Sequence, residues 1–341
     1  MSLKKADQAA LNSWVNRLIA KHRVLGVKEK ADRFIFGPLS SASELRLDYD
    51  VTILPPKQYF LPPREALLKF GQTGDHQPVF DDTPFVLHGV HPYDMVAISQ
   101  MDAIFSKDNH DSHYMTRRKG ATIVACDVQK PSSNVFAGCM GTATVQEGFD
   151  VLLTYVDDGY VVDARTAKGE ELVSELGDVP AADPDSLRRR DEIWKAAPQL
   201  LRKHELKCAP DDLPALLEKS YRHPIWRERA TLCHSCGSCN LVCPTCYCFD
   251  VRDEINWDMQ SGVRSRQWDG CMLRDFAVVA GGHNFREQKD QRFRHRYYRK
   301  GKYLWDRMGQ IACVGCGRCV TACTTKIANP VEVYNALLED K

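Results

Sequence analysis

Residues 233–248 read CHSCGSCNLVCPTCYC, which places six cysteines within sixteen positions. Two kinds of protein carry cysteines at such density. In an oxidising compartment the thiols form disulfides, whereas in a reducing compartment clustered cysteines more often bind metal. The rest of the chain has to decide between these two uses.

The sequence shows no pattern for export or for membrane insertion, which favours the reducing cytoplasm. The chain has 341 residues, enough for two domains, with 43% hydrophobic residues and a formal charge of +1. This balance gives no reason to expect nucleic acid or anionic lipid as a partner. No apolar run approaches the ~18 residues that span a bilayer, and the N-terminal segment 1–23 has charges inside its apolar stretch, unlike a signal peptide. We therefore expect a cytoplasmic protein whose clustered cysteines bind metal.

One cysteine spacing occurs twice in the second part of the chain. The run C-x2-C-x2-C-x3-C is typical of bacterial ferredoxins, where it binds [4Fe–4S] clusters. Cysteines two residues apart wrap a tight loop whose backbone N–H groups point at the cluster, and glycines such as Gly237, Gly315 and Gly317 suit such a loop. The first run consists of Cys233, Cys236, Cys239 and Cys243, and the second of Cys313, Cys316, Cys319 and Cys323.

The fourth cysteine of each run begins a departing segment and is expected to reach the other cluster. Cluster 1 would then take Cys233, Cys236, Cys239 and Cys323. Cluster 2 would take Cys313, Cys316, Cys319 and Cys243. Zinc is the main alternative metal, but zinc sites pair two C-x2-C units or add histidines and do not use this fourfold run twice.

Four further cysteines lie near these runs. Cys246, Cys248, Cys271 and Cys208 could bind a third iron–sulfur cluster. Alternatively they are buried thiols that pack near the other clusters, since free cysteine is among the most buried residue types and C-x-C is poor spacing for a cubane. Cys126 and Cys139, the two cysteines of the first 200 residues, are expected to be structural.

The chain changes character near residue 200. Residues 1–200 predict a mixed α/β scaffold and docking domain, with strands at 85–90 and 121–128, a hairpin at 150–165 and a helix at 92–105. Residues 168–206 and 211–228 have helical patterns. Few strand signals remain beyond residue 233, so residues 201–341 predict a mostly α-helical domain that carries two clusters. The whole chain is thus of the α+β class.

The segment 281–303 is dense in arginine and aromatic residues. It is interpreted as a solvated basic face or as counter-charge for the anionic clusters. A docking surface for an acidic electron-transfer partner is the functional alternative. Because no dinucleotide fingerprint, Walker loop or catalytic triad is present, the sequence predicts no catalytic residue.

The motifs together resemble one family. CHSCGSCNLVCPTCYCFDVRDE (233–254), RQWDGCMLRDFAVVAGGHNFRE (266–287) and CVGCGRC (313–319) are similar to the iron–sulfur subunit of anaerobic sulfite reductase, to the β subunit of soluble NiFe hydrogenases (sulfhydrogenases), and to the related subunit of heterodisulfide-reductase-associated complexes. The segments 89–105, 112–127 and 139–154 resemble the same family, so the resemblance covers nearly the whole chain.

The resemblance implies a helical dicluster ferredoxin domain with two [4Fe–4S] clusters in an anaerobic hetero-oligomer. It implies partners on two sides, an FAD/NAD(P)H-binding subunit on one side and a terminal catalytic subunit on the other. Two positions depart from the family pattern: Tyr93 stands where relatives often have cysteine, and VFAGCMGT (135–142) retains only Cys139. The N-terminal domain is therefore expected to serve as scaffold and docking surface without an extra redox group.

The resulting hypothesis is an electron-transfer subunit that relays electrons between these two partners. One alternative is a self-contained sulfur-compound reductase that binds its substrate in the N-terminal domain, at His88, His91, Asp94 and Arg117. The other is a structural role in which clusters only stabilise the fold.

Overall fold

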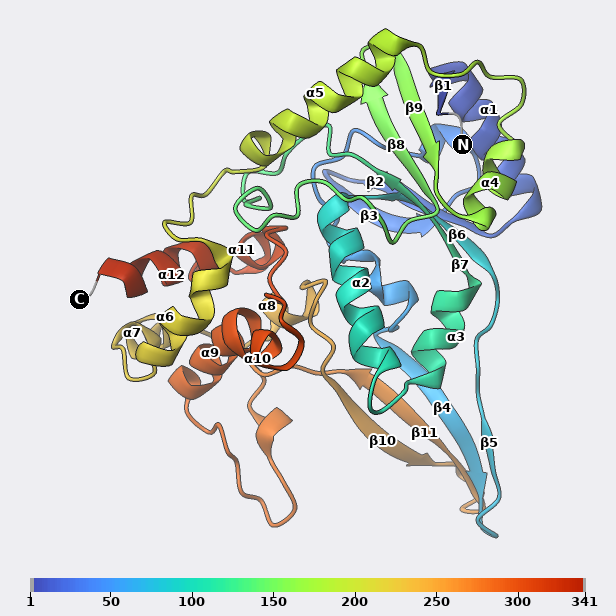
Figure 1. Ribbon diagram of the computed structural model, residues 1–341. Coiled ribbons are helices and arrows are strands. Elements are labelled where there is room, and N and C mark those ends of the chain that lie inside the picture. Colours follow the sequence, from blue (N-terminus) through green and yellow to red (C-terminus); the bar gives the residue numbers. More distant parts are fainter. Residues whose placement is uncertain (1–2, 340–341) are drawn as a thin grey trace.

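The computed structural model describes residues 3–339, which form a large sheet, a smaller sheet and a helical region beside them (Figure 1). The large sheet has seven strands in the order β1-β9-β8-β7-β6-β2-β3. Its central pairs β2–β6, β6–β7 and β7–β8 are parallel, and its outer pairs are antiparallel. The strands are β1 (Lys4–Asp7), β2 (Val24–Lys30), β3 (Arg33–Pro38), β6 (Phe85–Val90), β7 (Ala121–Cys126), β8 (Val151–Val156) and β9 (Gly159–Ala164).

Helices cover both faces of this sheet because its strands are apolar on both sides. On β6, Val86 packs with helix α1 (Gln8–Lys21) on one face, and Leu87 packs with α2 (Pro92–Ser106) on the other. Helix α3 (Ser112–Gly120) lies on the α2 side, and α4 (Ala167–Ser174) on the α1 side. The strand at 85–90, the hairpin at 150–165 and the helix at 92–105 are confirmed.

The second sheet corrects one expectation. Beyond residue 233 the chain forms a hairpin, β10 (Phe249–Ile255) and β11 (Ser261–Trp268), where few strand signals were found. This hairpin pairs with β4 (Arg64–Gly71), and β5 (His76–Pro78) completes a four-stranded antiparallel sheet. The later part of the chain is therefore helical around its cysteines but shares a sheet with the earlier part.

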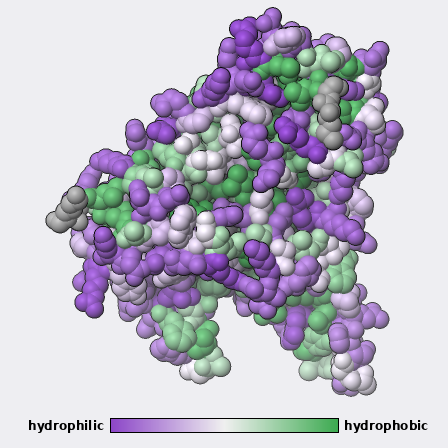
Figure 2. Space-filling model, viewed as in Figure 1, coloured by the Kyte–Doolittle hydropathy of each residue, from purple (hydrophilic) through white to green (hydrophobic). Residues whose placement is uncertain are grey.

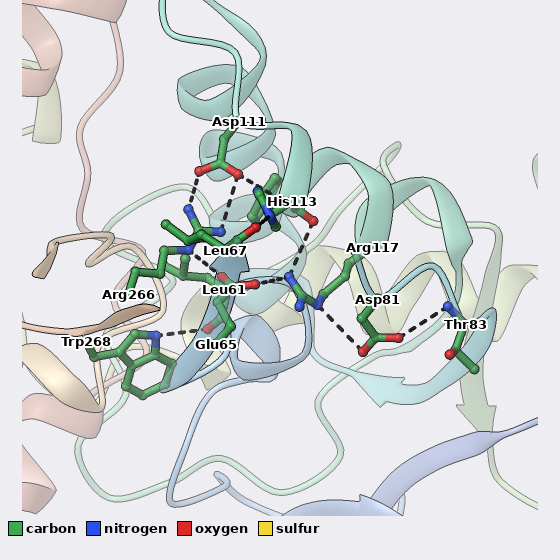
Figure 3. A network of polar contacts seen from close by, with 11 residues as sticks. Leu61, Glu65, Leu67, Asp81, Thr83, Asp111, His113, Arg117, Arg266 and Trp268 are labelled. Atoms are coloured by element: carbon green, nitrogen blue, oxygen red, sulfur yellow. Dashed lines mark hydrogen bonds and ion pairs between the residues drawn. The ribbon is translucent and has the colours of Figure 1, made fainter. Parts of the chain in front are cut away.

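A buried ionic network fixes this sheet against α3 (Figure 3). The Glu65 carboxylate lies between the guanidinium groups of Arg117 and Arg266, and Arg266 also pairs with Asp111, the N-cap of α3. Glu65 and Arg266 are 7% and 2% exposed. Buried charges that are paired on all sides specify one geometry, and removal of one partner is costly.

The helical region is more broken than its pattern suggested. Residues 168–206 form two helices, α4 and α5 (Pro184–Leu200). Residues 211–228 also form two, α6 (Leu213–Lys219) and α7 (Ile225–Thr231), because Pro224 interrupts the helix and starts the next one. The remaining helices are α8 (Ser238–Leu241), α9 (Lys289–Tyr298), α10 (Leu304–Met308), α11 (Arg318–Ala322) and α12 (Pro330–Glu339), with a π-helical turn at Arg299–Tyr303 between α9 and α10.

A small core joins the two regions. Tyr93 and Ala97 of α2 pack with Ala137 and with Val314 and Cys316 of the second cysteine run. None of the helices within residues 3–339 is long and apolar enough to cross a membrane.

An ion pair lies beside this core. Asp94 accepts two hydrogen bonds from Arg318, at 2.6 and 2.7 Å, and both residues are almost fully buried. Arg318 also donates to the backbone oxygen of Thr52 at 2.9 Å. The second cysteine run is therefore anchored directly on the N-terminal region.

Candidate metal centre

Four cysteines from both runs line a cavity of about 450 Å³ at the edge of the helical region. Three of them belong to the first run and the fourth, Cys323, ends the second run. The apolar side chains of Met272, Phe293 and Ile327 form much of the remaining wall. The cysteines of this cavity, called here the outer cavity, are Cys233, Cys236, Cys239 and Cys323.

The other four cysteines line a second cavity of about 410 Å³. Phe136 of the N-terminal region and the aromatic rings of Tyr297 and Tyr334 enclose it. The grouping coincides with the exchange of fourth cysteines expected from the spacing. The cysteines of this inner cavity are Cys313, Cys316, Cys319 and Cys243.

The two loops have the same backbone conformation. Gly237 and Gly317 have φ of +74° and +76° and directly precede α8 and α11. Two residues earlier in each loop, Ser235 and Gly315 also have positive φ. The alternation turns the backbone back on itself, so that successive amides can point inward as in anion-binding nests.

Donors on the loops point at the sulfur atoms. The Ser235 amide donates to Cys233 Sγ at 3.3 Å. Hydroxyl groups two residues after a cysteine lie close to it in both runs, as Thr245 does to Cys243 at 3.4 Å and Thr325 to Cys323 at 3.6 Å. Such contacts favour a thiolate over a thiol and suit cysteines that hold metal.

Two buried cations line the cavities. Arg296 of α9 lines both, is 2% exposed, and its Nε and Nη1 atoms have no hydrogen-bond partner in residues 3–339. Lys300, in the π-helical turn, lines the inner cavity and is 7% exposed. Burial acts to lower the pKa of Lys300, but the neighbouring thiols of Cys243 and Cys246 raise it above the usual range. An unpartnered guanidinium is costly to bury unless an anion compensates it, so these cavities suit a negatively charged group.

The set of four cysteines in each cavity suits a [4Fe–4S] cluster. Among residues 3–339, no three histidine, cysteine, aspartate or glutamate side chains lie close enough together to hold one metal ion. A zinc ion needs its thiolates within roughly 4 Å of one another, because each Zn–S bond is about 2.3 Å long. A cubane carries its thiolates on four separate irons and so spreads them further apart.

Of the six remaining cysteines, three line a third cavity and three lie elsewhere. Cys246, Cys248 and Cys271 line a third cavity of about 310 Å³ beside the inner one, but Cys208 does not line it and packs instead at the edge of the helical core. Cys126 is fully buried in the large sheet, where burial raises its pKa. Cys139 donates to the backbone oxygen of His204 at 3.3 Å.

The structure does not assemble the alternative substrate site. Asp94 is paired with Arg318, and Arg117 with Glu65. His88 packs edge-on against Trp14, and burial lowers its pKa to about 3. His91 stacks on Tyr49 with ring centres 3.9 Å apart. All four side chains are buried, and their contacts are those of a packed core.

The basic segment 281–303 divides into two sets. Arg292, Arg296 and Lys300 are 4%, 2% and 7% exposed, and each lines a cysteine cavity or contacts its loop, since Arg292 donates to Ser235 Oγ at 3.1 Å. Arg294 is half-buried and contacts Tyr221. Counter-charge for the clusters thus accounts for the first set. Its four-residue spacing is the signal that could have identified it from the sequence.

Comparisons with known proteins agree with this geometry. The model of the 4Fe-4S dicluster domain matches residues 232–327, which contain the cysteines of all three cavities. The sulfhydrogenase 2 subunit beta of Pyrococcus furiosus is 36% identical over 326 residues, covering 95% of this chain and 95% of that protein. No solved structure matches the chain. The dicluster domain implies two [4Fe–4S] clusters, as expected from the repeated spacing.

Proposed function

Since the chain belongs to the family of sulfhydrogenase beta subunits, we propose that it relays electrons between an FAD/NAD(P)H-binding subunit on one side and a terminal catalytic subunit on the other. The family and the dicluster domain support the coarser statement directly: the chain is an iron–sulfur electron-transfer subunit of a multi-subunit oxidoreductase. The terminal subunit would be a NiFe hydrogenase, a sulfite reductase or a heterodisulfide reductase.

The observation that carries the proposal is the pair of adjacent cavities, each with four cysteines, that meet at Arg296. In the proposed assignment, Cys233, Cys236, Cys239 and Cys323 hold one cluster, and Cys313, Cys316, Cys319 and Cys243 hold the other. A bound [4Fe–4S] cluster supplies reversible one-electron chemistry. The chain positions the thiolates, excludes water with Phe136, Tyr297 and Tyr334, and provides a shared positive charge between the two sites.

The two cavities differ in exposure, as a relay requires. Cys236 is exposed, whereas Cys316 and Cys319 are 7% and 9% exposed. An outward-facing cluster can exchange electrons with a partner protein, and a buried one with its neighbour. We therefore assign the outer cavity to the contact with one of the two partners.

Exposed apolar residues support a partner on this side. Leu232, adjacent to Cys233, is 59% exposed, and Phe285 and Val279 on the loop before α9 are 64% and 44% exposed. Figure 2 shows this loop as an apolar projection at the lower left of the molecule. Exposed apolar surface of this kind marks interaction sites. Residues 1–200 would then serve as scaffold and as a further docking surface, and residues 201–341 as the cluster-bearing part.

The test is anaerobic purification of the chain with whatever co-purifies. Iron and acid-labile sulfide are measured together with the EPR spectrum after NAD(P)H addition. About eight or more iron per chain, reduced by NAD(P)H through a bound flavoprotein, would support the relay. Four or fewer iron in fully loaded protein would overturn it, as would clusters that no flavoprotein partner can reduce.

A further inference from the structure

A third cavity lies next to the inner cavity and is also lined by cysteines. Its volume is about 310 Å³, and Thr245, Arg296 and Lys300 line both cavities. The three cysteines of this cavity are Cys246, Cys248 and Cys271.

The charges around this cavity are unbalanced. Arg296, Arg299 and Lys300 line it, and no aspartate or glutamate does so among the described residues. Arg296 has two donor nitrogens without a partner, although it is 2% exposed. A fourth cation, Lys57, donates to the backbone oxygen of Cys246 at 2.6 Å. Lys300 donates to Thr245 Oγ1 at 2.6 Å and Arg299 donates to the Tyr247 hydroxyl, so Arg296 is the buried cation of this wall whose unpartnered nitrogens call for an anion.

One buried side chain orients two of the sulfurs. Asn240 is 2% exposed, and its Nδ2 atom lies 3.4 Å from Cys271 Sγ and 3.6 Å from Cys246 Sγ. Its carbonyl oxygen accepts from the Met272 amide at 3.1 Å, which fixes the amide orientation. Gly270 permits this approach, because a Cβ atom there would lie 2.8 Å from Asn240 Cβ.

We propose that Cys246, Cys248 and Cys271 hold a third iron–sulfur cluster, of the [4Fe–4S] class, whose fourth iron has a ligand other than cysteine. Three thiols select a soft metal centre over other anions such as phosphate. Cys208, which does not line the cavity, is not a ligand. This site extends the proposed relay without sharing any of its eight cysteines.

The experiment is an iron and sulfide count on the full-length, anaerobically reconstituted chain, with EPR in the reduced state. The wild type is expected to hold about twelve iron. Cys248→Ser and Cys271→Ser should each reduce this to about eight and should retain the signals of the other two clusters. Cys208→Ser and Cys126→Ser are matched controls that should keep about twelve.

The possible counts separate the two proposals. About eight iron in the wild type, unchanged in Cys248→Ser and Cys271→Ser, would overturn the third cluster and leave the relay intact. Four or fewer in the wild type would overturn the relay itself. Because the wild-type count alone tests whether the third cluster exists, a variant that fails to fold does not block the test. Loss of four iron in Cys208→Ser would overturn the ligand assignment.

Discussion

The two cysteine loops share one spacing and one backbone conformation, but their surroundings differ. The loop at 233–243 faces outward, and the one at 313–323 packs against residues 134–142 and α2. The difference in packing is clearest at the residue that directly precedes the third cysteine of each run. Ser238 occupies this position in the outer loop, and the buried Arg318 occupies it in the inner loop. The same local motif is thus packed against the N-terminal region in its second copy and is accessible in its first.

The largest effect should follow from removal of one cysteine in each loop. We expect Cys236→Ser and Cys316→Ser each to lose about four iron, because each removes one proposed thiolate ligand. Cys316 also belongs to the core between the two regions, so its variant should lose solubility or thermal stability as well. Iron analysis and thermal unfolding of both variants measure this. Equal thermal midpoints would contradict the claim that the inner loop is packed more tightly than the outer one.

The next effect concerns Arg318 and its counterpart Ser238. Arg318→Ala leaves the Asp94 carboxylate buried without its partner and should lower the free energy of unfolding by about 3–5 kcal/mol. Ser238→Ala removes one contact to a partly exposed loop and should cost about 1 kcal/mol or less. Denaturant unfolding under anaerobic conditions compares the two. A small loss for Arg318→Ala would mean that the inner loop does not depend on this anchor.

The loop glycines give a smaller and more specific contrast. An alanine at either Gly237 or Gly317 adopts a left-handed conformation, which costs about 1–2 kcal/mol. At Gly317 the new Cβ would also lie 2.3 Å from the Asn134 backbone oxygen, whereas at Gly237 it would meet the flexible Leu273 side chain at 2.8 Å. Gly317→Ala should therefore destabilise the protein more than Gly237→Ala, measured by the same unfolding experiment. The reverse order would contradict the tight packing of the inner loop.

The smallest effect is on reduction potential. Lys300 lines the inner cavity but not the outer one. Lys300→Met removes a positive charge that favours the reduced, more negative state, so the potential of the inner cluster should fall by on the order of tens of millivolts. Lys302→Met is the control, because Lys302 pairs with Glu218 and Asp306 at the surface. Redox titration followed by EPR should show the outer cluster at an unchanged potential; a shift of the outer cluster, or any shift in the Lys302 variant, would refute the assignment.

The sequence predicted those parts of the structure that depend on residues close to one another in the chain. The β6 strand, the β8–β9 hairpin and the cysteine spacing all arise within short segments. The hairpin β10–β11 was missed because its strands alternate charged residues and because its partner β4 lies far away in the chain. The role of Asp94 was missed for the same reason: Arg318, which is 224 residues away, turns a candidate substrate-binding residue into a structural ion pair.

The pairing of β4 with β11 also sets an order of events during synthesis. Glu65 leaves the ribosome long before Arg266, which is 201 residues later. At 5–20 residues per second, roughly 10–40 seconds pass before the carboxylate meets its arginine and the strand meets its neighbour. During that interval β4 has an unpaired edge that can join another chain. Residues 64–71 are therefore an aggregation-prone edge of the nascent chain until residues 261–268 have been made.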